Sequence, residues 1–123
     1  MQSSTETWQR VFGAAVEHAY DSVLVTDSDF HIVHVNPGFT QLTGYTPDEV
    51  MGRTPSFLQG PDTDPEVIAR LHRTIDTGGV FEGSTVNYRK DGTPFPIGWT
   101  VAPVRDADGA VTHYVTIQRE VPA

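Results

Sequence analysis

The stretch Gly52-Arg-Thr-Pro55-Ser-Phe-Leu-Gln59-Gly-Pro61 lies in the middle of the chain, between two sequence signals for the start of a helix. Before it, Thr46-Pro-Asp-Glu49 has the spacing of a capping box, with proline at the first helical position. After it, Asp64-Pro65 opens a second helix in the same way, and Gly78-Gly79 ends that helix. The stretch therefore separates two predicted helices.

Two more helices are predicted from capping residues and periodicity. Asn36 caps a helix that has Pro37 in its first turn and ends at Gly44. Residues 6–19 carry apolar side chains at helical spacing, so we assign residues 1–20 to an amphipathic flanking helix and residues 21–121 to a single domain. The helix that starts at Asp64 has its own apolar set, which is Val67, Ile68, Leu71 and Ile75.

Strands are predicted on both sides of these helices. Residues 22–26 and 31–35 are rich in β-branched residues and are joined by a turn at Asp27–Phe30. Three further strands are predicted over residues 80–89, 95–104 and 111–119, the last two joined by a hairpin turn at Asp106-Ala-Asp-Gly109. This order predicts an α+β fold, a five-stranded antiparallel sheet with short helices on one face.

Composition limits the function of the chain. Its 123 residues contain no cysteine, which excludes disulfides, thiolate catalysis and cysteine metal sites. The net charge of −8 disfavours binding to nucleic acid. No apolar run approaches the roughly 18 residues of a membrane helix, and we expect a cytoplasmic protein without membrane contact. No nucleophile–base pair or metal-ligand spacing of the histidines is visible, so we expect neither enzymatic activity nor a metal site.

Several segments in order resemble the PAS family of sensor domains. They are Asn36-Pro-Gly-Phe39, Leu42-Thr-Gly-Tyr45, Asn87-Tyr-Arg-Lys-Asp-Gly92 and the closing Val115-Thr-Ile-Gln-Arg-Glu120. The stretch from Gly52 to Gly60 resembles the signature of the light-oxygen-voltage (LOV) branch, Gly-x-Asn-Cys-Arg-Phe-Leu-Gln-Gly, with Pro55 in place of the photoreactive cysteine. The resemblance implies the PAS fold and a flavin site that cannot form the covalent cysteine adduct.

The resemblance also implies which residues line the ligand pocket. The amides of Gln59, Asn87 and Gln118 match positions that hold the flavin ring. Other positions depart from the branch: Thr54 and Ile97 replace asparagines, Ser56 replaces a phosphate-binding arginine, and His72 stands near the second such arginine. Because side chains alternate along a strand, Trp99 and Val101 should share the face of Ile97, and the bulk of the tryptophan argues against a standard flavin pose.

We therefore expect a sensory input module of a larger bacterial or archaeal signalling protein, such as a histidine kinase or a cyclic-dinucleotide enzyme. It would bind an unidentified small ligand or no cofactor, with non-covalent flavin mononucleotide as one alternative and haem disfavoured. A ligand-free interaction domain with a dry core is the other alternative. The resemblance implies a homodimer through the sheet face of His113, Val115 and Ile117 and the N-terminal helix, together with a linked output domain.

Overall fold

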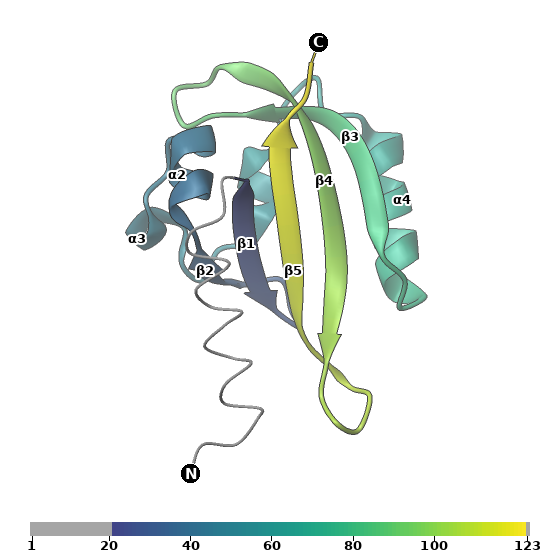
Figure 1. Cartoon of the computed structure of the whole chain (residues 1–123). Coiled ribbons are helices and arrows are strands. Elements are labelled where there is room, and N and C mark those ends of the chain that lie inside the picture. Colours follow the sequence, from purple (N-terminus) through teal and green to yellow (C-terminus); the bar gives the residue numbers. More distant parts are fainter. Residues whose placement is uncertain (1–20, 123) are drawn as a thin grey trace.

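A computed structural model describes residues 21–122, which form a five-stranded antiparallel sheet (Figure 1). The strands are β1 (Ser22–Asp27), β2 (Ile32–Val35), β3 (Phe81–Tyr88), β4 (Pro94–Arg105) and β5 (Val111–Glu120). Their order across the sheet is β2-β1-β5-β4-β3, so the last strand in the sequence lies in the centre. The predicted fold class is confirmed, whereas the predicted helix in residues 1–20 lies outside the described residues.

The helical segments between β2 and β3 begin where their capping residues predict. Asn36 caps α2 (Pro37–Thr43) by accepting from the backbone N–H of Phe39, and Gly44 ends this helix with a positive φ of 83°. The predicted capping box is present at α3 (Pro47–Val50). Asp64 caps the longest helix, α4 (Pro65–Asp76). A short 3-10 helix, η1 (Pro55–Leu58), was not predicted.

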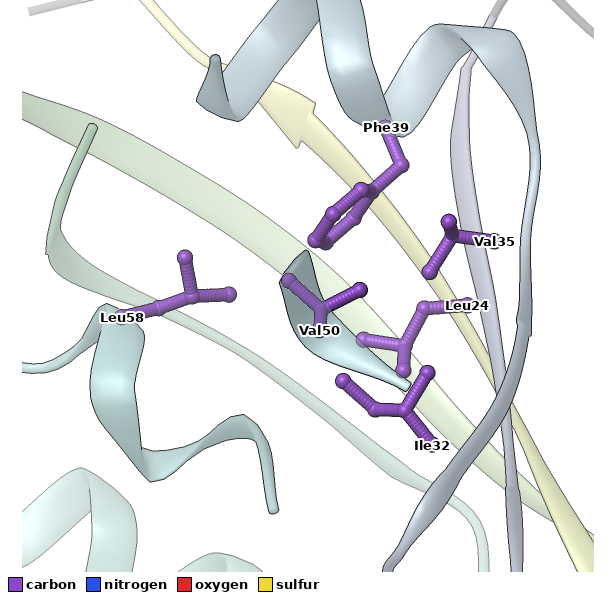
Figure 2. Close-up of a cluster of buried hydrophobic side chains, with 6 residues drawn as sticks. All are labelled: Leu24, Ile32, Val35, Phe39, Val50 and Leu58. Atoms are coloured by element: carbon purple, nitrogen blue, oxygen red, sulfur yellow. The ribbon is translucent and has the colours of Figure 1, made fainter. Parts of the chain in front are cut away.

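The helices lie in two groups against the sheet (Figure 1). In one group α2 and α3 pack beside β1 and β2, and in the other α4 lies along β3 at the far edge. The core between the first group and the sheet consists of completely or almost completely buried side chains, shown in Figure 2: Leu24, Ile32, Val35, Phe39, Val50 and Leu58. A second buried cluster of Phe81, Val101 and Tyr114 lies towards α4, which contributes Val67, Leu71 and Ile75.

The pairing of the strands fixes which side chains are neighbours. Across the β4–β5 pair Trp99 lies opposite Gln118, and across the β1–β5 pair Ser22 also lies opposite Gln118. Gln118 therefore has a side-chain neighbour on each adjoining strand of the central part of the sheet. Among the helices of residues 21–122, none combines the length and the hydropathy that crossing a membrane requires.

Candidate functional site

A cavity of about 320 Å³ lies between the inward face of the sheet and the two helical segments η1 and α4. Leu24, Thr26, Asn87, Trp99, Val101, Thr116 and Gln118 form the wall on the sheet side. The turn before β2, η1 with its flanks, and α4 supply the rest: Asp29, Phe30, Thr54, Pro55, Ser56, Leu58, Gln59, Ile68, Leu71, His72 and Ile75. The volume falls within the range of about 300–1,000 Å³ that is typical of small-molecule sites.

Alternation along β5 places Thr116 and Gln118 towards this cavity. Tyr114, Thr116 and Gln118 are buried, whereas Ile117, which points to the opposite face, is 43% exposed. Burying an amide is costly unless it is hydrogen-bonded, and Gln118 meets this condition by accepting from the hydroxyl of Ser22 at 3.0 Å. The bond ties the cavity wall to the first residue of β1.

Trp99 occupies the wall of the cavity. Its ring packs against Phe81 with 4.9 Å between the ring centroids, at an interplanar angle of 46°. Phe81 belongs to the neighbouring strand and is almost completely buried, so it is a rigid packing partner for the indole. The indole therefore packs against β3 and forms part of the cavity wall, with a space of about 320 Å³ remaining beside it.

Seven of the eight residues expected to line a ligand pocket surround this one cavity. They are Thr54, Pro55, Gln59, His72, Asn87, Trp99 and Gln118. The exception is Ile97, which is completely buried and does not reach the cavity. Ile97 shares the inward face of β4 with Trp99, as predicted. It lies two residues nearer to the start of the strand, next to the buried Phe95 on the same face.

The rim of the cavity is formed by η1 and its flanks. Proline has a fixed φ and no N–H, so Pro55 is suited to the first position of this short helix. At this rim the hydroxyls of Thr54 and Ser56 lie 3.1 Å apart, and the exposed Gln59 follows the last residue of η1. The side chains available here offer hydrogen bonds but no nucleophilic sulfur.

The turn between β1 and β2 contributes wall residues that the sequence analysis did not predict. Phe30 adopts a φ of 65°, rare for a bulky residue, and stacks on Tyr114 with 4.5 Å between centroids. The turn is held by Asp27, whose carboxylate accepts from the backbone N–H groups of Asp29 and His31, both at 2.9 Å. The bond from His31 is the main cause that lowers the pKa of Asp27 below its usual value.

The same turn corrects one expectation about metals. We expected no grouping of histidine with carboxylates, but potential ligand atoms of Asp27, Asp29 and His31 lie within 4.8 Å of one another. On an extended strand, residues two positions apart lie roughly 7 Å from one another, whereas the turn brings these three side chains together. Since Oδ1 of Asp27 already accepts two backbone hydrogen bonds, the grouping serves the turn.

Comparison with known proteins identifies the family. The sequence model described as PAS domain matches residues 21–122. The chain is 45% identical over 96 residues to phototropin-2 of Oryza sativa subsp. japonica, which covers 78% of this chain and 11% of that protein. It is 39% identical over 113 residues to a blue-light-activated histidine kinase of Brucella ovis, covering 89% of this chain and 23% of the kinase. The chain thus spans a small part of each relative.

Solved structures agree with these relatives. A light-oxygen-voltage domain whose mechanism was studied with a flavin analogue superposes with a TM-score of 0.85 at 34% identity, covering 91% of this chain and 85% of that one. An RNA-binding light-oxygen-voltage receptor gives a TM-score of 0.86 at 32% identity, covering 98% of this chain and 36% of that one. This chain belongs to the PAS domain family, in its light-oxygen-voltage branch, and it has no cysteine with which to form the covalent flavin adduct.

Proposed function

We propose that the domain is the sensory input module of a larger signalling protein, such as a histidine kinase, and that it holds a planar heteroaromatic ligand non-covalently in the cavity. The observation that supports this most directly is that the amides of Gln59, Asn87 and Gln118 line the same apolar space. Each amide offers both a donor and an acceptor, which is what the imide edge of a flavin ring requires.

The open cavity favours a ligand over the alternative of a dry interaction domain. A space of about 320 Å³ is many times larger than a few waters need. Flavin is the first candidate, because a solved relative at 34% identity was studied with a flavin analogue. A flavin in this cavity could not form a cysteinyl adduct, since the chain contains no thiol, and it would be held non-covalently.

A route for the signal begins at Gln118. Its amide contacts the cavity on one side, and its Oε1 accepts from Ser22 at the start of β1. Gln118 also lines a second, more open cavity between α2 and β5, together with Asp21. A ligand that changes the orientation of this amide would alter the bond to Ser22, and β1 would pass the change towards the preceding segment of the chain.

We further propose that two copies associate through the outer sheet face that carries Ile117.

The test is a binding titration of purified apo-protein with flavins, followed by flavin fluorescence. Replacing Gln118 or Asn87 by leucine should weaken binding about tenfold each, which is roughly the value of one hydrogen bond lost from a buried partner. Gln41→Leu is the matched control, because this exposed amide on α2 borders the second, more open cavity and not the proposed ligand site, so its loss should leave the affinity unchanged. Unchanged affinity in both cavity variants would reject the proposed site.

A further inference from the structure

No lysine or arginine of residues 21–122 lines the cavity. Among its residues only Asp29 and His72 can ionise, and both are exposed at its margin. A ligand whose charged group entered this site would therefore meet one carboxylate and no permanent cation. The sequence as a whole has the same bias, since its net charge is −8.

The cations nearest to the cavity have other partners. The guanidinium of Arg53 lies 4.2 Å from the ring centroid of Phe57. Arg70 is on α4, but its guanidinium lies over the ring of Phe81 and donates to the carbonyl of Glu82 at 3.0 Å. Both guanidinium groups are therefore engaged with aromatic rings, and neither residue is among those that line the cavity.

The other cations in residues 21–122 also have partners. Arg73 is paired with Glu66 at 3.0 Å on the exposed side of α4. Arg89, Lys90 and Arg119 pair with Glu120, Glu49 and Asp21, and Arg105 donates to the carbonyls of Gly78 and Gly109. None of them is among the residues of the wall, so no described cation is positioned to neutralise a phosphate in the cavity.

A phosphate monoester carries a charge of about −1.5 to −2 at neutral pH. At the exposed rim of Thr54 and Ser56 such a group would find no cation to balance its charge and would be repelled by the carboxylate of Asp29, which costs binding free energy. A neutral ligand with the same ring would avoid this cost and still use the amides of Gln59, Asn87 and Gln118. The composition of the wall therefore favours binding of a phosphate-free ligand over a ligand that has the same ring system and carries a phosphate.

On the basis of the proposed function, we infer that the cavity takes a phosphate-free flavin of the riboflavin type and discriminates against flavin mononucleotide. The ribityl chain ends in a hydroxyl, which the rim hydroxyls of Thr54 and Ser56 can match with neutral hydrogen bonds. Selectivity then arises from the missing cation and from the like charge of Asp29.

The first experiment titrates riboflavin and flavin mononucleotide separately into the apo-protein at about pH 8, where histidine side chains are ordinarily neutral. Riboflavin should bind at least about tenfold more tightly, the factor that corresponds to one charge-assisted hydrogen bond. Equal affinity, or tighter binding of flavin mononucleotide, would overturn the inference and leave the proposed function standing. Failure of both flavins to bind would instead contradict the proposed function.

A gain-of-function variant tests the cause of the selectivity. Ser56→Arg replaces a rim hydroxyl by a cation, and it should tighten binding of flavin mononucleotide about tenfold, whereas riboflavin gains nothing from the charge and loses one neutral hydrogen bond. The matched control is Ser84→Arg, which adds the same charge at an exposed position of β3 outside the cavity and should change neither affinity. If Ser56→Arg has no effect, or tightens both ligands equally, a missing cation does not explain the selectivity.

Discussion

Asn36 shows how one buried side chain can connect two elements. Its Oδ1 accepts from the backbone N–H groups of Phe39 at 3.0 Å and Val23 at 2.8 Å, and its Nδ2 donates to the carbonyl of Asp21 at 3.0 Å. The residue thus caps α2 and also anchors that helix to the beginning of β1. The same start of β1 carries Ser22, the partner of Gln118 in the cavity wall.

We predict that Asn36→Ala lowers the free energy of unfolding by about 3 kcal/mol, because it removes a helix cap worth about 1 kcal/mol and leaves buried backbone groups without partners. Urea denaturation followed by circular dichroism measures the change. Ser28→Ala is the control, since this exposed residue lies in the turn after β1 and its loss should cost no more than about 0.5 kcal/mol. A similar small loss in both variants would show that water replaces the amide.

Pro55 changes both the backbone and the chemistry at one position. It begins η1, and it stands in the cavity wall where the light-oxygen-voltage signature has its reactive cysteine. The sequence alone shows the proline at this position, and it therefore predicts that no cysteine adduct can form. The 3-10 helix itself was not, because a segment of four residues has no periodicity from which to predict it.

At the scale of elements, Glu49 joins α3 to the turn between β3 and β4. Its carboxylate accepts from the ammonium of Lys90 and from the backbone N–H of Thr46, which completes the capping box. The hydrogen bond with Lys90, supported by that from Thr46, lowers the pKa of Glu49 to about 2. Ionisation of Glu49 therefore stabilises the folded state relative to the unfolded state.

Because the pKa is lower in the folded state, the contribution of Glu49 to stability is fully present above about pH 4.5 and is lost as the pH falls towards 2. We predict that Glu49→Gln unfolds at lower urea concentration than the wild-type protein at pH 7, and that the difference shrinks across this window. Glu82→Gln, at an exposed position of β3, serves as the control. A difference between Glu49→Gln and wild type that does not change with pH would contradict the assignment.

Local signals made the elements predictable, whereas the shape of the cavity depends on contacts between distant residues. The caps Asn36, Thr46 and Asp64 act within three residues of themselves, so the sequence alone reveals them. The orientation of Trp99 depends on Phe81, a residue from another strand, and no local pattern indicates that the indole leaves the ligand space open. Likewise, Ile97 has the right strand parity, but its neighbours cover it completely.

At the scale of the whole molecule, the two faces of the sheet differ in what covers them. The inward face packs on helices and encloses the cavity, whereas the opposite face leaves Ile117 43% and Val104 41% exposed. Val25 and Val115 lie opposite each other across the β1–β5 pair and are half-buried on that outer face. Apolar side chains gathered on a sheet face favour association with another surface.

We predict that the protein associates through this face and that Ile117→Glu shifts it towards the monomer, because a carboxylate would be buried without a partner at the contact. Light scattering coupled to size-exclusion chromatography measures the change. Met51→Glu is the matched control, since Met51 is 41% exposed but lies at the end of α3, outside the sheet.

The net charge of the molecule predicts how the association depends on salt concentration. Two copies that each carry a net charge of −8 repel one another, so added salt should promote the wild-type association by screening that repulsion. Ile117→Glu should stay monomeric at the high salt concentration at which both the wild type and Met51→Glu associate. Equal association of the two glutamate variants at every salt concentration would place the contact elsewhere on the surface, because both variants add the same charge and differ only in its position.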